Sequence, residues 1–302
     1  MRLVWLAVFL TVSLILAPLA AAQRPAQTGK VYRVGSLNPP TRKSSEHLVQ
    51  AFEQEISRLG WVLGQDLAIE YRWAEGRYER LPALAAELVQ LKVDVIIAST
   101  TPAILAAQKA TSSIPIVMVQ GPDPVASGFA RSFAQPGGNI TGTTSLAGWE
   151  TVGKRLQLLK EAVPQVSRVA VLGNPANPSY QLALTEVRTA ASSLNFERQL
   201  LRARGPEEFD SAFAAMKREH AGALLVLGDA MFFAHRARLV ELATMSRLPT
   251  MFAQKEPVEA GGLMAYVTDF ADSLRRAAGY VDISKHAGRV NDESILVDEI
   301  AV

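Results

Sequence analysis

The sequence predicts an α/β protein with two lobes, each built on a doubly wound parallel sheet. Short apolar runs rich in β-branched residues alternate with amphipathic stretches between residues 31 and 266, as in βαβ units. The run VDVIIAS at 93–99 is apolar on both faces, as expected of a parallel strand covered by helices on each side. The alternation breaks off near residues 136–150 and then resumes, which favours two lobes over one continuous sheet.

In the first half of the chain, the predicted strands are 31–37, 66–73, 93–99, 114–119 and a segment around residue 140, and the predicted helices are 44–59, 81–91 and 102–110. The first helix places Leu48, Phe52 and Ile56 on one face, and Gly60 ends it. Pro102 suits the first turn of the third helix. We assign residues 31–145 to the first lobe.

The second half repeats this scheme. Its predicted strands are 168–172, 197–201, 223–227, 249–252 and 263–266, and its predicted helices are 179–194, 207–219 and 235–245. We assign residues 146–262 to the second lobe.

The N-terminus has the features of a secretory signal peptide. Arg2 precedes an apolar run from Leu3 to Leu16, and the segment ends in three alanines at 20–22, which together give the n-region, h-region and cleavage site. The run before Pro18 is shorter than the roughly 20 residues of a membrane anchor. We expect residues 1–22 to be removed after Ala22 and residues 23–30 to form a linker. The mature chain would then lie in the periplasm.

Composition excludes several classes of protein. The net charge of +2 gives no basic stripe, so no nucleic-acid partner is expected. The chain has no cysteine, so a lipid anchor and disulfides are not expected and the fold depends on its core. A mature chain of this length buries about three quarters of its surface. We expect it to be free in solution.

Polar side chains follow most of the predicted strands, and open parallel sheets bind ligands beyond the carboxyl ends of their strands. These segments are 36–41, 99–102, 120–124, 173–179, 228–229 and 267–269. We expect a ligand carboxylate at Ser99–Thr101, where a helix begins, and a ligand ammonium near Asp123 or Asp229. For each residue alone, the alternative is a simple helix cap. Tyr180, Phe232 and Tyr266 lie at or just beyond strand ends, where they would stack on a flat apolar group or belong to the core.

The sequence gives little support for an enzyme. His47, His220, His235 and His286 have no metal-ligand spacing, and neither a nucleophile elbow nor a Walker A motif occurs. Gly137-Gly138 is better explained as a turn. We expect no catalytic residue, no metal and no cofactor.

The order of these motifs resembles one family. The residues that carry the resemblance are DPV at 123–125, Gly128, PGGNITG at 136–142, Lys154, the leucines at 156, 158 and 159, Lys160, RVAVL at 168–172, residues 174–178, GGLMAY at 261–266 and RRAA at 275–278. Over residues 30–282, the chain resembles the ABC transporter substrate-binding proteins, a family that includes tryptophan- and tyrosine-binding members.

The resemblance implies a type I periplasmic-binding-protein fold, in which hinged lobes hold a small-molecule ligand between them. It implies a membrane permease of an ABC importer as partner, and we expect a monomer. The ligand of relatives is often an aromatic amino acid. In this chain Asp123 and Asp229 favour a ligand with an amine, and the aromatic residues near the strand ends favour a flat apolar part, so we expect an aromatic or branched amino acid. The ligand-binding residues that the resemblance implies are Asn38, Ser99, Thr100, Thr101, Asp123, Asn174, Asn177, Ser179, Asp229 and Tyr266.

Three departures from the family pattern stand out. Gln135 replaces a basic residue, residues 267–269 replace a Gly-Pro-Asn turn, and the match stops after Asp282. We expect residues 263–302 to return to the first lobe but to leave it incomplete, without one strand and with an open sheet edge.

Other functions remain open at this point. A sensory binding protein that presents its ligand to a membrane receptor kinase has the same sequence features as a transport receptor. An exported α/β enzyme is a weaker alternative, and the altered tail raises the possibility of a nonfunctional remnant.

Overall fold

The computed structural model describes residues 30–121, 123–145, 150–287, 294–297 and 300–301. Residues 31–302 form one compact unit. The predicted signal peptide, its cleavage site after Ala22 and the linker up to residue 29 lie outside the described residues. In the part of the chain that the structure describes, we find no helix with the length and apolarity that a membrane span requires.

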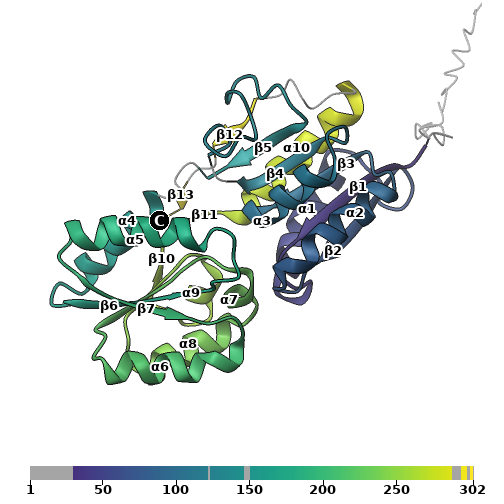
Figure 1. Ribbon diagram of the computed structural model, residues 1–302. Helices are drawn as coiled ribbons and strands as arrows, with labels where there is room; N and C mark the ends of the chain where they lie inside the picture. The colour runs from purple at the N-terminus through teal and green to yellow at the C-terminus, as the bar shows by residue number, and fades with distance from the viewer. Residues whose placement is uncertain (1–29, 122, 146–149, 288–293, 298–299, 302) are drawn as a thin grey trace, which may run out of the picture. The chain divides into compact units, whose positions relative to one another are not determined.

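The first lobe is built on a sheet that has six parallel strands among the described residues, in the order β12-β5-β4-β3-β1-β2 (Figure 1). Its elements are β1 (Tyr32–Asn38), η1 (Lys43–Ser45), α1 (Glu46–Arg58), β2 (Leu67–Trp73), η2 (Tyr78–Arg80), α2 (Leu81–Gln90), β3 (Val95–Ser99), α3 (Thr100–Ala110), β4 (Ile116–Gly121), β5 (Ile140–Thr144), α10 (Phe270–Ala287) and β12 (Leu296–Val297).

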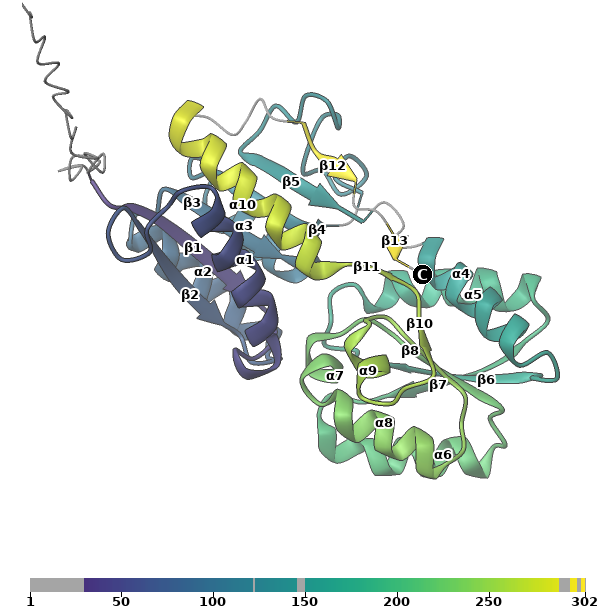
Figure 2. The same ribbon diagram turned by 180° about the vertical axis from the view of Figure 1, so that it is seen from behind.

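Successive residues of β3 serve two separate cores, because side chains alternate across a strand. Val95 and Ile97 pack with the apolar faces of α1 and α10, which lie side by side on one face of the sheet (Figure 2). Ile96 and Ala98 pack with α2 and α3 on the other face. This double cover explains why the run at 93–99 is apolar throughout.

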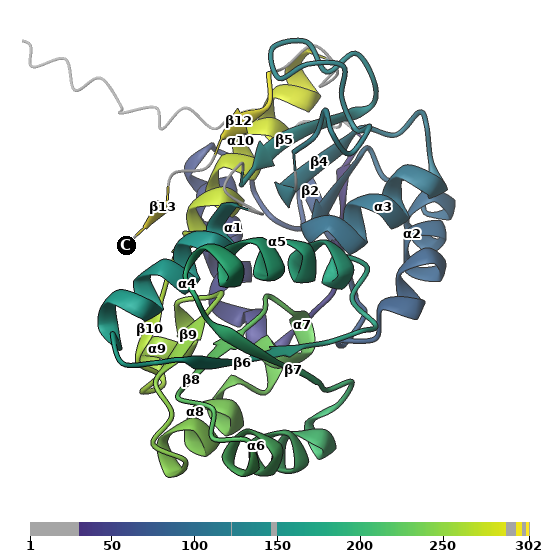
Figure 3. The same cartoon turned by 60° about the vertical axis from the view of Figure 1, so that its left-hand side comes forward.

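The second lobe has a parallel sheet in the order β10-β9-β8-β6-β7. Its elements are α4 (Glu150–Ala162), β6 (Arg168–Gly173), α5 (Tyr180–Ser193), β7 (Glu197–Arg202), η4 (Pro206–Glu208), α6 (Phe209–Arg218), β8 (Ala223–Val226), α7 (Ala230–Ala234), α8 (Arg236–Met245), β9 (Thr250–Phe252), α9 (Glu256–Glu259) and β10 (Met264–Ala265). Helices α4 and α5 cover one face of the sheet, and α6 and α8 cover the other (Figure 3). The predicted fold class, two doubly wound α/β lobes, is confirmed.

The chain passes from the first lobe to the second between β5 and α4 and returns through the short strand β11 (Val267–Thr268) (Figure 2). Strand β11 pairs antiparallel with β13 (Ile300–Ala301), with Val267 opposite Ala301. The tail therefore supports the returning segment.

Two expectations about the end of the chain are wrong. Met264 and Ala265 pair with β9 in the second sheet, so the return to the first lobe begins after Ala265 and not at residue 263. The expected open edge of the first sheet is also covered, because β12 pairs in parallel with β5 and places Leu296 opposite Thr143. Strand β12 has only two residues, both apolar. A run of two residues shows no alternation of apolar and polar side chains, so a strand cannot be predicted from it.

Candidate ligand-binding site

A cavity of about 280 Å³ is lined by residues at the carboxyl ends of strands in both sheets. Asn38, Trp73 and Ser99 contribute from the first lobe, and Asn174 and Leu227 from the second. Parallel sheets leave this edge to loops and helix N-termini, so the topology itself creates the crevice.

The cavity brings together most of the predicted ligand-binding residues. Those that line it are Asn38, Ser99, Thr100, Thr101, Asn174, Asn177, Ser179 and Asp229. Residues from both lobes therefore meet at one site.

Asp123 and Tyr266 are not among the lining residues. The carboxylate of Asp123 accepts hydrogen bonds from the backbone N–H groups of Val125 (2.8 Å) and Ala126 (3.0 Å), so it caps the turn that follows. The side chain of Tyr266 packs on the second-lobe core. Phe232 also lies in that lobe's core, at 2% exposure. We leave all three out of the site.

Asp229 is a buried carboxylate that caps α7. Its Oδ1 accepts hydrogen bonds from the N–H groups of Met231 (2.9 Å) and Phe232 (3.4 Å) and from Nδ2 of Asn174 (3.2 Å). Its Oδ2 accepts from Tyr78 and from Nδ2 of Asn177 (3.1 Å). Burial raises the pKa of Asp229, although these hydrogen bonds oppose the rise. The helix-cap interpretation thus accounts for its position.

Tyr78 joins the two lobes at this point. Its hydroxyl, in η2 of the first lobe, donates to Asp229 at 2.8 Å and accepts from the N–H of Ala230 at 3.1 Å. Burial and then the charge of Asp229 raise the pKa of Tyr78 well above 10, so the hydroxyl keeps its proton. A second contact between the lobes joins Nε2 of His47 on α1 to Oε1 of Glu256 on α9, at 3.1 Å.

Three residues that line the cavity hold a buried polar atom without a hydrogen-bond partner among the described residues. Among the described residues, the buried side-chain atoms without a hydrogen bond are Ser45 Oγ, Trp73 Nε1, Tyr180 Oη and Gln199 Oε1, and all but the last belong to residues that line the cavity. A buried polar group left unpaired costs about 1–3 kcal/mol. These three atoms are themselves buried, so a ligand in the cavity reaches them only if the side chains turn.

Arg155 places a positive charge in the cavity wall. This residue of α4 lines the cavity, is 9% exposed, and donates from Nε to the carbonyl of Tyr266 at 2.8 Å. No carboxylate in the described part of the chain forms an ion pair with it. Burial lowers the pKa of Arg155 to about 10, so it remains charged at neutral pH.

Aromatic residues form part of the wall. The aromatic lining residues are Phe52, Tyr71, Trp73, Tyr78, Tyr180, Phe233 and Phe270. The rings of Tyr71 and Trp73 are stacked, with centroids 5.9 Å apart. A flat apolar group fits such walls.

Two lining residues have left-handed backbones. Thr100 directly follows β3 and has a φ of 66°. Gln120 is the next-to-last residue of the neighbouring strand β4 and has a φ of 50°. For a β-branched residue such as Thr100, this conformation is a rare and costly one. Backbone strain of this kind gathers at functional sites.

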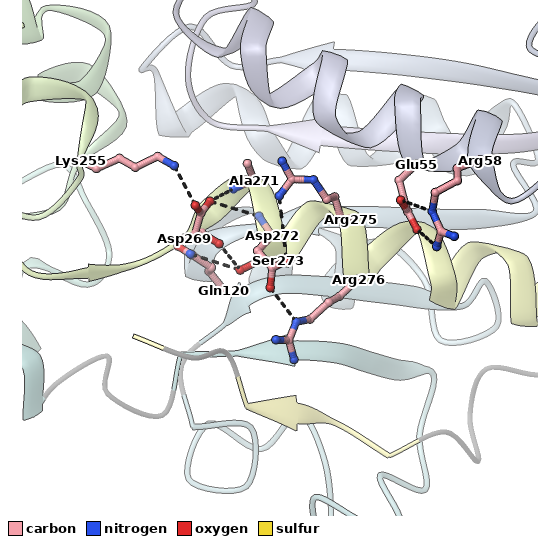
Figure 4. Close-up of polar contacts among 10 residues, drawn as sticks. All are labelled: Glu55, Arg58, Gln120, Lys255, Asp269, Ala271, Asp272, Ser273, Arg275 and Arg276. Carbon is pink, nitrogen blue, oxygen red and sulfur yellow. Dashed lines mark hydrogen bonds and ion pairs between the residues drawn. The ribbon is translucent and has the colours of Figure 1, made fainter. Parts of the chain in front are cut away.

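Gln120 also connects the cavity to the returning segment. Its Nε2 donates to Oγ1 of Thr268 at 2.7 Å. The same nitrogen donates to Oγ of Ser273 at 3.3 Å (Figure 4). Beside it, Lys255 of the second lobe donates to Oδ2 of Asp269 at 2.8 Å, and Oδ1 of Asp269 accepts from two N–H groups at the start of α10. The return to the first lobe is therefore fixed by polar contacts at the cavity's edge.

Sequence reasoning missed Ser45, Trp73, Tyr78 and Arg155. Trp73 ends a predicted strand, so the rule that found Asn38 and Ser99 applies to it as well. Tyr78 and Arg155 belong to a 3-10 turn and a helix, where no local pattern indicates that they face the cavity.

This architecture agrees with comparisons to known proteins. Residues 41–283 match the family model described as ABC transporter substrate binding protein. Because the match spans most of the chain, the protein belongs to this family of solute-binding proteins.

Individual relatives are distant. The chain is 24% identical over 252 residues to the tyrosine-binding protein of Clostridioides difficile (strain R20291), covering 83% of this chain and 70% of that one. Its fold is similar to that of a conserved domain protein from Vibrio cholerae (TM-score 0.79, 22% identity, 90% and 92% of the two chains covered). It is also similar to that of an ABC domain from Streptococcus pneumonia in complex with L-Trp (TM-score 0.76, 19% identity, 89% of each chain covered). Type I periplasmic binding proteins, among them a leucine-binding protein from Thermotoga maritima, share the fold.

Proposed function

We propose that this protein is the extracytoplasmic receptor of an ABC importer and that it captures a small aromatic ligand with a polar end between its lobes. One observation carries the proposal. The cavity lies at the carboxyl ends of both sheets and is lined by polar and aromatic residues from both lobes.

The chemistry of the wall supports the ligand class. Tyr71, Trp73 and Phe233 line the cavity and give its wall an aromatic part that suits a flat apolar group. Asn38, Ser99, Thr101 and the amides and hydroxyl at 174–179 offer hydrogen bonds to the polar end. A relative that binds tyrosine and a structural neighbour bound to L-Trp are consistent with this class.

The mechanism is closure of two lobes around the ligand without a chemical reaction. A ligand that contacts residues of both lobes has more contacts in the closed state, and it stabilises that state by this difference alone. Hinge closure of this kind is common among periplasmic binding proteins. The closed receptor would then dock on a membrane permease as a monomer.

Native mass spectrometry of the protein purified from rich medium tests the ligand proposal. We expect a retained aromatic metabolite, and a melting temperature that rises with some aromatic amino acids or their relatives. The ligand's mass should be unchanged after incubation. Failure of every small aromatic solute to bind would overturn the proposal.

The proposed location has its own test. N-terminal sequencing of the protein recovered from the periplasm should begin at Gln23. Recovery with residues 1–22 intact from the cytosol would contradict an extracytoplasmic receptor.

A further inference from the structure

We infer that the ligand is an aromatic carboxylic acid held by Arg155, and that an amino group is not needed for its recognition. This inference rests on the proposed function and narrows its ligand class. It follows from how the charged residues of the cavity wall are already engaged.

Four charged residues stand among the described lining residues, namely Arg155, Asp229, Lys255 and Glu256. Lys255 forms an ion pair with Asp269 at 2.8 Å. Among the described residues Arg155 has no such partner, and its hydrogen bond to the carbonyl of Tyr266 uses Nε alone. The two terminal nitrogens of a guanidinium can each donate one N–H bond in parallel, and this pair matches the two oxygens of a carboxylate. A buried cation with this geometry favours an anionic ligand.

Of the two carboxylates in this wall, only Glu256 has an oxygen, Oε2, that accepts no hydrogen bond among the described residues and could receive a ligand ammonium. A carboxylate has about four lone-pair sites, and Asp229 already accepts from five donors, including Tyr78 and two asparagines. Glu256 is 6% exposed and contacts His47 through Oε1. The expectation that Asp229 receives an ammonium is therefore not supported by its contacts.

The unpaired atoms point the same way. Trp73 Nε1 is a donor and cannot accept, and it is buried without an acceptor. The hydroxyls of Ser45 and Tyr180 are also unpaired and able to donate. Arg155 adds N–H donors to the wall, whereas hydroxyls such as these can also accept. The oxygens of a ligand carboxylate accept hydrogen bonds from such donors, and so does the phenol oxygen of a ligand that has one. An ammonium group instead brings three further N–H donors.

Matched ligand pairs test the inference on the purified protein without any mutation. Calorimetric titrations compare L-tryptophan with indole-3-propionate, L-tyrosine with 3-(4-hydroxyphenyl)propionate, and L-phenylalanine with 3-phenylpropionate. The amide 3-phenylpropionamide and the amine tryptamine serve as probes that lack the carboxylate. We expect each acid to bind at least as tightly as its amino acid, and the amide to bind about 10-fold more weakly or worse than its acid.

Two variants locate the carboxylate. Arg155→Met should weaken binding of the best acid by about 10-fold or more while leaving binding of the amide nearly unchanged. Arg155→Lys keeps the charge and should recover part of the loss. The control is Arg188→Met, because Arg188 is an exposed residue of α5 outside the cavity, and it should bind like the unmodified protein.

The outcomes separate this inference from the proposed function. An amino acid that binds more than about 10-fold tighter than its acid, with the advantage lost in Glu256→Gln, would overturn the inference and leave the receptor intact. Equal acid binding by Arg155→Met and the unmodified protein would also overturn it. Absence of binding by every acid and amino acid would contradict the proposed function itself.

Discussion

The hydroxyl of Tyr78 in the first lobe donates a hydrogen bond of 2.8 Å to Oδ2 of Asp229 in the second. The same hydroxyl accepts from the N–H of Ala230, at the first turn of α7. One side chain of the first lobe thus completes the N-terminus of a second-lobe helix. Since both groups are buried, the two lobes share a hydrogen-bond network beside the cavity and do not merely touch.

Replacing Tyr78 by Phe should loosen this contact. The change removes a donor from a buried carboxylate and an acceptor from a buried N–H, at a cost of about 1–3 kcal/mol. We expect the unfolding free energy to fall by this amount, and the radius of gyration of the ligand-free protein, measured by X-ray scattering, to increase as the open state gains population.

Tyr32→Phe is the matched control. The Tyr32 hydroxyl bonds to Ser284 within the first lobe, so its loss should affect stability without changing the scattering. The lobe contact is refuted as a determinant of closure if Tyr78→Phe and Tyr32→Phe give the same scattering curve.

Much of this fold could be predicted because parallel strands covered on both sides are continuous apolar runs. The predicted bounds of β3, β6 and β8 differ from the observed ones by at most two residues. The same topology rule located Asn38, Ser99 and Asn177 in the cavity wall. Elements of two residues, such as β12, carry no such signal.

The rest of the site depends on tertiary packing. Asp123 also follows a strand, but the chain turns there and its carboxylate serves the next backbone N–H groups. Arg155 lies on α4, where a sequence shows only that a helix has a charged residue among leucines. Its position in the cavity wall follows from how α4 packs next to Tyr266, which local patterns cannot give.

Acid should weaken the ion pair of Asp269 and Lys255. Burial alone would raise the pKa of Asp269, but the hydrogen bonds from Lys255 and from the N–H groups of Asp272 and Ala271 outweigh it and lower the pKa below 3.8. A carboxylate whose folded pKa is depressed stabilises the fold above its unfolded pKa, and this contribution is lost as the pH falls through the folded value.

Chemical denaturation of Asp269→Asn between pH 3 and pH 7 measures the effect. Asn keeps the capping acceptor but loses the charge. Because both partners are more than a third exposed, we expect a deficit of no more than about 1 kcal/mol. The deficit should be constant above about pH 5 and shrink below 3.8. In the Asp269→Asn background, Lys255→Met should lower the unfolding free energy little further. If the two single losses simply add in the double variant, the pair is not coupled.

Gly142 should tolerate no side chain. It lies in β5 with a φ of +125°, and a Cβ atom there would approach the carbonyl oxygen of Met118 in β4 to 2.2 Å. Backbone cannot move away as a flexible side chain can. We expect Gly142→Ala to cost more than about 4 kcal/mol, a value typical of severe steric disruption.

Gly64→Ala separates this clash from the backbone conformation. Gly64 has a φ of +81° with no atom within 4 Å of an added Cβ, so only the left-handed backbone is penalised, by about 1–2 kcal/mol. Equal losses in the two variants, measured by urea denaturation, would show that contact with Met118 is not the cause.

Thr100→Gly should stabilise the free protein while weakening ligand binding. A left-handed conformation costs a residue with a side chain about 1–2 kcal/mol, and glycine removes this cost. The greater freedom of glycine in the unfolded chain destabilises the fold by about 0.5–1 kcal/mol and so offsets part of the gain. The difference favours the variant by between zero and about 1.5 kcal/mol. The hydroxyl in the cavity wall is lost, however, so binding of the ligand should weaken.

Lys92→Gly is the control. It relieves a similar left-handed backbone, with a φ of 52°, at a residue that does not line the cavity, so it should raise stability and leave affinity unchanged. If Thr100→Gly lowers both the unfolding free energy and the affinity, the left-handed turn at the start of α3 is not strained, and Thr100 contributes to the site only through packing.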